Sequence, residues 1–221
     1  LEEQLRIHQP RSFEGIHERS ARFFEQRKQW ETALSHYEKI NNLKAVAALL
    51  NDYGSKMLES GKLERLYGQI KRIPDEVKDQ YYRLWFLQGE VERYRSFYIE
   101  AENSYERAIC EANKKGNQLE KSKALEGKAK IYLDTIQPYN AERLLYQAIE
   151  IRENSEVSTE EETHKLYRLL AENLINSGKA LKAEKWMKRA QAFNASIVDG
   201  NLEARLYLRT GRLEEARRVL L

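Results

Sequence analysis

The sequence is poor in the residues that form tight turns and cross-links: its 221 residues include 10 Gly, 3 Pro and 1 Cys. So little Gly and Pro argues against an all-β chain, which needs many turns. The single Cys110 excludes an intramolecular disulfide and is typical of a reducing compartment. Because Cys110 lies in a stretch with a helical pattern, we expect it to be a small buried residue.

The sequence also lacks long apolar runs and a strong charge bias. No window of about 18 residues is apolar and free of charge, so we expect no membrane-spanning segment and no membrane partner. The 38 basic and 35 acidic residues nearly balance, whereas a nucleic-acid-binding domain usually carries a larger basic excess. We therefore expect DNA contact only through domains outside this chain.

Helix-forming residues are abundant, because Ala, Leu, Glu, Lys and Arg dominate the composition. Apolar residues make up 41% and aromatic residues 10%, which is enough to build a core and argues against disorder. The composition predicts an all-α fold.

The two ends of the sequence have the character of a fragment. Residues 1–11 are polar, without an initiator Met and without the apolar region of a signal peptide. Residues 214–221 stop within an amphipathic pattern. We therefore expect a piece excised from a larger cytoplasmic protein, and homo-oligomer formation stays open.

An apolar pattern recurs along the chain, and its clearest copy contains Tyr98, Ala101, Tyr105 and Ala108. A degenerate copy with Leu66 in place of the first Ala lies at 63–73. The positions equivalent to Ala101 are 33, 66, 101, 141, 183 and 216, so the intervals are 33, 35, 40, 42 and 33 residues. Intervals near 34 residues are typical of helix–turn–helix repeats, of which this chain would hold about six.

Each repeat also carries a small residue in its first helix. Trp85 and Gly89 form the clearest case, and Ala takes the place of Gly89 at positions 21, 129, 171 and 204. Gly within a helix costs about 1 kcal/mol relative to Ala, so Gly89 indicates close approach of a partner helix. The aromatic residues at repeat positions are predicted to fill the core beside these small residues: Phe23, Phe24, Trp30, Tyr37, Trp85, Tyr98, Tyr105 and Tyr132.

Turn and cap signals separate the predicted helices. Gly61, Gly178 and Gly211 each follow a predicted helix, where a left-handed residue commonly closes the last turn. Ser158 and Glu161 have the spacing of a capping box at the start of a later helix.

These residues together resemble the tetratricopeptide repeat, and the resemblance covers the whole chain. It implies an all-α, right-handed superhelix of antiparallel helix pairs with about six repeats. We expect a single solenoid over residues 1–221, with divergent repeats in 1–75 and more regular ones in 76–221.

A narrower resemblance concerns the first 75 residues and is carried by residues 16–24, 30–37, 42–50, 60–64 and 73–74. These segments are similar to the sensor region of large bacterial LuxR-type transcription activators of the maltose-regulon activator class. That resemblance implies a nucleotide-binding module before this segment, a DNA-binding helix-turn-helix elsewhere, and repeats that receive an inducer or a protein.

The sequence contains no common catalytic or metal-binding motif. It has no phosphate loop of the form G-x4-G-K-[ST], no G-x-S-x-G elbow and no H-E-x-x-H. The four histidines, at positions 8, 17, 36 and 164, do not pair at the spacing that places two ligands on one helical face. We expect no enzyme activity, no catalytic residue, no bound metal and no cofactor.

The first helices of a helical-repeat solenoid line its concave groove, and function is expected there. Helical periodicity places a mixed-charge set with two aromatic rings on that side. Such a groove suits a peptide, or a small polar ligand stacked on a ring, although simple solvation of these side chains stays an equal alternative. The predicted groove residues are Arg83, Phe86, Glu90, Arg93, Tyr94, Glu126, Lys130, Asp134, Arg168, Glu172 and Asn176.

Two hypotheses of function follow. In the first, the chain is a sensor or interaction domain of a bacterial transcription regulator, and a bound effector shifts the population of superhelix curvatures. In the second, it is a free-standing scaffold that docks a partner peptide and has no role in transcription.

Overall fold

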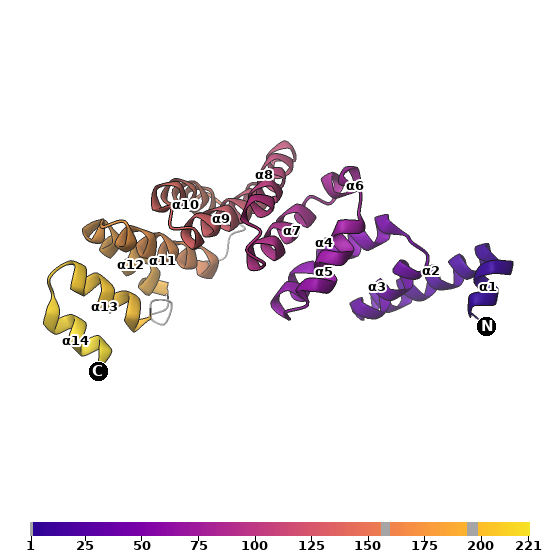
Figure 1. The fold of residues 1–221 in the computed structure, drawn as a ribbon, viewed down its shortest axis with the longest axis horizontal. Coiled ribbons are helices and arrows are strands. Elements are labelled where there is room, and N and C mark those ends of the chain that lie inside the picture. Colours follow the sequence, from indigo (N-terminus) through magenta and orange to yellow (C-terminus); the bar gives the residue numbers. More distant parts are fainter. Residues whose placement is uncertain (1, 156–159, 194–198) are drawn as a thin grey trace. The chain divides into compact units, whose positions relative to one another are not determined.

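The structure, a computed structural model, describes residues 2–155, 160–193 and 199–221, and the regular elements in those ranges are all α-helices (Figure 1). The contacts divide the chain into two compact units, Leu1–Val91 and Glu92–Leu221. The capping box predicted at Ser158 and Glu161 involves a position outside the described residues.

The first unit holds six helices and most of a seventh. They are α1 (Glu2–His8), α2 (Pro10–Gln26), α3 (Trp30–Lys39), α4 (Leu43–Glu59), α5 (Leu63–Arg72), α6 (Asp75–Gln80) and α7 (Arg83–Tyr94), whose last residues belong to the second unit. In this unit α3 packs between α2 and α4, and α4 also contacts α5.

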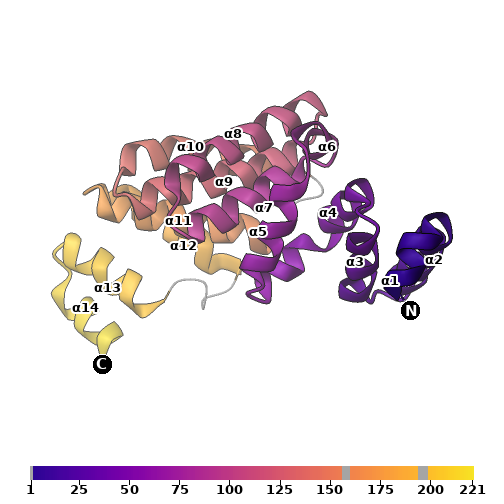
Figure 2. The same ribbon diagram turned by 45° about the vertical axis from the view of Figure 1, so that its right-hand side comes forward.

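The second unit begins with the end of α7 and with α8, continues with two long helix pairs and ends with one short pair. Its helices are α8 (Tyr98–Lys114), α9 (Gln118–Asp134), α10 (Pro138–Glu153), α11 (Glu160–Asn176), α12 (Ala180–Phe193), α13 (Gly200–Arg209) and α14 (Leu213–Leu220). Neighbours along the chain pack on one another, and α13 also contacts α11; Figure 2 shows α8 and α10 running beside α9.

The expected helix pairs are confirmed, because each repeat becomes one first helix and one second helix. The six first helices are α2, α4, α7, α9, α11 and α13, and the second helix of each repeat is the next in order after a short turn. Of the described helices, α1 and α6 stand outside this alternation. The all-α, tetratricopeptide-like solenoid predicted from spacing is therefore what the chain forms.

Small residues recur in the first helices at a constant distance from the second helix. The buried pairs 21/33, 54/66, 89/101, 129/141, 171/183 and 204/216 are each twelve residues apart. Gly54 is a member that the sequence pattern missed, because its partner Leu66 departs from Ala. A Cβ on Gly54 would lie 2.4 Å from Leu87 Cδ1. The close packing of α4 against α7 therefore requires a residue without a side chain at this position.

The turns after the first helices all contain a left-handed residue. Gly61, Gly178 and Gly211 have φ values of 73°, 77° and 75°, which confirms the prediction for these glycines. The other three turns use residues with a side chain at the same place, namely Lys28, Ser96 and Ile136. The repeat therefore imposes the left-handed conformation even where Gly is absent.

Each unit has its own apolar core. In the first unit the core includes Leu34, Leu50, Leu66 and Ile70, and in the second it includes Leu145, Leu166, Leu170 and Met187. The degenerate repeat at 63–73 thus packs like the regular ones.

Two predictions about burial are wrong. Cys110 is exposed, because it lies two residues after buried Ala108 and so points to the opposite side of α8. Phe23 is 46% exposed for the same reason, two residues after buried Ala21, and the Arg27 guanidinium lies 3.9 Å from its ring centroid.

Among the described residues, no helix is both long enough and apolar enough to cross a membrane.

Candidate functional site

The predicted groove residues divide between the two units. Arg83, Phe86 and Glu90 lie in the part of α7 that belongs to the first unit; Glu90 is buried and the other two are half-buried. The remaining predicted residues belong to the second unit, and we call them the polar face: Arg93, Tyr94, Glu126, Lys130, Asp134, Arg168, Glu172 and Asn176.

The polar face begins where the end of α7 meets the end of α9. Arg93 Nη1 donates to Asp134 Oδ2 at 3.0 Å, and the Arg93 guanidinium lies 4.6 Å from the centroid of the Tyr94 ring. Tyr94 is 56% exposed, which is unusual for a large aromatic side chain. This end of the face therefore offers an open ring with a cation held beside it.

Glu126 occupies the middle of the face and is held from two sides. Lys130 Nζ lies 2.8 Å from one carboxylate oxygen, and Arg152 Nη2 donates to the other at 2.8 Å. Arg152 comes from α10 and is only 4% exposed, and its Nε donates to Ser122 Oγ at 3.0 Å. Ser122 Oγ in turn donates to the carbonyl oxygen of Ala148 at 3.0 Å. This buried chain fixes Glu126 in position.

The face continues across α11 to the start of α13. Arg168 lies 3.4 Å from Glu172 Oε2 and donates to Asp199 Oδ2 at 3.2 Å. The backbone N–H of Leu202, followed by the Arg168 guanidinium, holds the pKa of Asp199 below its usual value. Arg168 therefore ties its own helix to the N-terminus of the next first helix.

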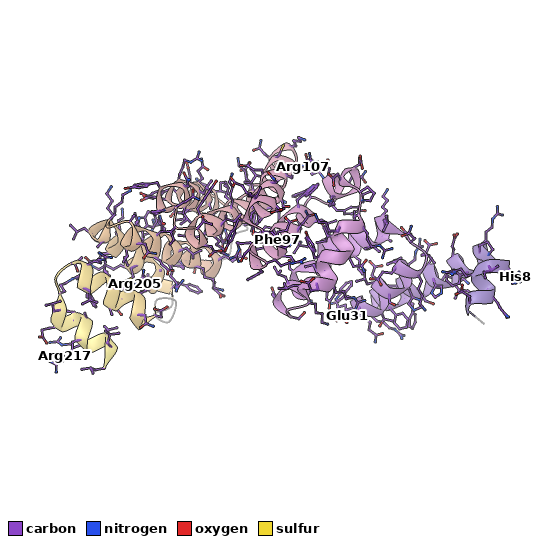
Figure 3. All side chains as sticks on the ribbon, in the orientation of Figure 1. His8, Glu31, Phe97, Arg107, Arg205 and Arg217 are labelled. Carbon is purple, nitrogen blue, oxygen red and sulfur yellow. The ribbon has the colours of Figure 1, made fainter. Side chains whose placement is uncertain are left out.

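Arg205 of α13, labelled in Figure 3, completes the face although the sequence analysis did not include it. Its guanidinium lies 3.6 Å from Glu172 Oε1 and also donates to Asn176 Oδ1. The contacts join the predicted residues of the second unit in three groups: Arg93 with Tyr94 and Asp134, Glu126 with Lys130, and Arg168 with Glu172, Asn176 and the added Arg205. Arg205 stands one repeat after Glu172 at the same repeat position, so the periodicity would have found it.

Two further features were missed because their residues are far apart in sequence. In the first unit, His17 of α2 and His36 of α3 approach to 2.7 Å between their Nδ1 atoms, although no histidine spacing predicted this. In the second unit, a cleft of about 320 Å³ opens between the ends of α9 and α11. Within the described ranges, no three His, Cys, Asp or Glu side chains cluster to hold a metal ion.

The polar face combines charged side chains, an amide and an exposed ring. Cations, carboxylates and an exposed ring alternate over neighbouring first helices, and hydrogen bonds already hold most of them in place. Such a surface can bind a polar chain that supplies both donors and acceptors, because each charge can exchange a neighbour for a ligand group.

The chain matches no protein-family model and no curated protein in sequence. Its structure is similar to solved helical-repeat structures. MamA protein matches with a TM-score of 0.62 and 14% identity, over 81% of this chain and 90% of that chain. YrrB, described as a TPR protein with an unusual peptide-binding site, matches with a TM-score of 0.56 and 18% identity, over 83% of this chain and 87% of that chain.

A third similar structure is the putative kinesin light chain, with nearly identical TPR-like repeats, of Podosopora anserina. It matches with a TM-score of 0.52 and 18% identity, over 93% of this chain and 90% of that chain. At such identities the likeness concerns the fold. The chain therefore has the fold of tetratricopeptide-repeat proteins.

Proposed function

We propose that this chain is a non-catalytic scaffold that docks a partner peptide on the polar face of its second unit. The observation that carries the proposal is the set of charged side chains on α9, α11 and α13, most of them half-buried and each held by a neighbour. Side chains that are already ordered lose little conformational entropy when a ligand binds, so they favour recognition.

The chemistry of the face matches that of a polypeptide. Arg168 and Arg205 can donate to carboxylates and backbone carbonyls, and Glu126 and Glu172 can accept from backbone N–H groups or from a Lys of the peptide. The exposed Tyr94 ring offers a stacking or packing surface at one end. The likeness in fold to YrrB, whose description names a peptide-binding site, supports the same class of ligand.

The test is a selection of random 12-residue peptides on the immobilised chain, followed by charge reversal. Arg168→Glu is expected to lower the affinity for the selected peptides at least tenfold, because it places a carboxylate beside Glu172 and Asp199. The matched control is Arg143→Glu on α10, an exposed residue outside the polar face. Failure to select any peptide, or equal loss in both variants, would overturn the proposal.

A second candidate is the sensor domain of a bacterial transcription regulator, supported by the resemblance of residues 1–75 alone. The two candidates separate in a thermal-shift screen of sugars, nucleotides and peptides. A ligand at 100 times its dissociation constant stabilises the folded state by about 2.7 kcal/mol. A sugar or nucleotide that raises Tm supports the sensor, and stabilisation by peptides alone supports the scaffold.

A further inference from the structure

The cleft at the ends of α9 and α11 adjoins the polar face, because Asn176 belongs to both. One part of its wall is apolar and comes from the end of α9 and the following turn: Tyr132, Leu133, Ile136 and Pro138. The other part consists of the amide side chains of Gln137, Asn173 and Asn176. None of these lining residues carries a formal charge, in contrast to the polar face beside them.

One hydrogen-bond acceptor in the wall of the cleft, the side-chain oxygen of Asn173, has no donor among the described residues. Asn173 is 0% exposed, and its Nδ2 donates to the carbonyl oxygen of Pro138 at 2.9 Å. That hydrogen bond fixes the orientation of the amide, and Oδ1 has no hydrogen-bond partner among the described residues. A buried acceptor without a donor is unfavourable, so the wall favours a ligand that brings an N–H group.

The turn beside the cleft exposes an apolar side chain. Ile136 is 87% exposed and has a φ of 56°, a conformation that a β-branched residue rarely adopts. The equivalent turn residues are Lys28, Gly61, Ser96, Gly178 and Gly211, none of which is a large apolar residue. This turn therefore presents apolar surface to solvent at the mouth of the cleft.

We propose that the cleft receives one uncharged apolar side chain of the docked peptide, while an adjacent peptide N–H donates to Asn173 Oδ1. This inference rests on the proposed function, and it specifies what the peptide must carry. The volume of about 320 Å³ lies at the lower end of ligand pockets, which suits one side chain and its flanking peptide groups. The neutral wall disfavours a charged side chain, which would lose its hydration without gaining a partner.

The test uses capped amino acids as probes of the cleft. N-acetyl-leucine methylamide, titrated into ¹⁵N-labelled chain, is expected to shift the Asn173 side-chain amide and the Ile136 backbone amide in a saturable manner. N-acetyl-aspartate methylamide and N-acetyl-glycine methylamide are expected to leave them unmoved. Equal shifts with all three probes, or no shift with the leucine probe, would overturn the proposal.

Substitutions separate the cleft from the polar face. Asn176→Trp places a large ring at the mouth of the cleft and is expected to weaken binding of the leucine probe at least fivefold. The matched control is Asn103→Trp, at an exposed position of α8. If selected peptides respond to Arg168→Glu but not to Asn176→Trp, the cleft is not the anchor and the proposed function stands. If the leucine probe binds but no peptide is selected, the proposed function is overturned. The inference that a peptide side chain occupies the cleft is then overturned as well.

Discussion

The two units share one repeat and ion pairs between its second helices, and the second unit also has ion pairs between first helices. In the first unit, Glu31 of α3 pairs with Lys62 and with Arg65 of α5, so the ion pairs join successive second helices. In the second unit, Lys179 at the start of α12 and Arg189 within it likewise join α12 to α10. Arg93 and Arg168 also join successive first helices there. The comparison teaches that one helix-pair geometry accommodates ion pairs between its second helices and between its first helices.

The units also differ in what fills the space beside their glycines. Gly54 faces the end of the Leu87 side chain, whereas Gly127 faces the ring of Tyr105, which is 0% exposed. A leucine can change rotamer, but a fully enclosed ring cannot move aside. The packing of the second unit is therefore the less adaptable.

The largest expected effect tests the buried anchor of the polar face. Arg152→Ala removes a 4% exposed cation from Glu126 and Ser122, and breaking a buried pair of this kind costs about 3–5 kcal/mol. The control in the first unit is Arg65→Ala, which breaks a partly exposed pair worth about 0–1 kcal/mol. Urea denaturation of both variants measures the difference, and equal losses would contradict it.

The next prediction compares the two glycines by the same substitution. Gly127→Ala is expected to destabilise by about 1–3 kcal/mol, because the new Cβ would lie 2.3 Å from Tyr105 Cε1. Gly54→Ala should cost less, since its nearest contact is a leucine methyl group. Gly68→Ala is the control: its Cβ would meet nothing within 4 Å, and the helix should gain about 0.5–1 kcal/mol. The reverse order in chemical denaturation would refute the account of packing.

A smaller effect concerns the strained turn after α9. Ile136→Gly is expected to stabilise the chain by about 0.5–1 kcal/mol net, because the left-handed conformation costs roughly 1–2 kcal/mol and the added flexibility of Gly offsets part of the gain. The same variant should weaken the leucine probe, since the cleft loses apolar wall. Lys28→Gly, in the first unit, should gain less because Lys is not β-branched. Thermal unfolding and probe titration check both expectations.

The last prediction is a matched loss of stability at alkaline pH. Burial, then a hydrogen bond to Glu25, raises the pKa of Tyr37 to about 12, and burial, then Glu153, does the same for Tyr167. A raised folded-state pKa means that the stabilisation is complete below the unfolded value of about 10 and is lost as the pH rises towards 12.

Single substitutions assign that loss to one unit at a time. Tyr37→Phe should reduce the alkaline loss in the first unit, and Tyr167→Phe should reduce it in the second. Phenolate absorbance and urea midpoints between pH 9 and 12 measure the effect. A loss that persists unchanged in both variants would show that these two hydroxyl groups do not cause it.

Much of the fold could be predicted because it depends on neighbours in sequence. Helix formers, the twelve-residue distance between small residues and the glycines at 61, 178 and 211 act within one helix pair, so their pattern is visible in the chain. The same periodicity selected the residues of the polar face other than Arg205, and their role in binding stays a prediction. Cys110 and Phe23 were misplaced although their helical phase relative to Ala108 and Ala21 predicts the exposed side.

What the sequence by itself determined is therefore the class of fold and the number of helix pairs. Only the tertiary structure decided that Arg152 secures Glu126, that Asn173 turns its amide to Pro138 beside a cleft, and that His17 meets His36. The physical reason is that these contacts join different helices, and their geometry depends on how whole helices pack rather than on a period along the chain.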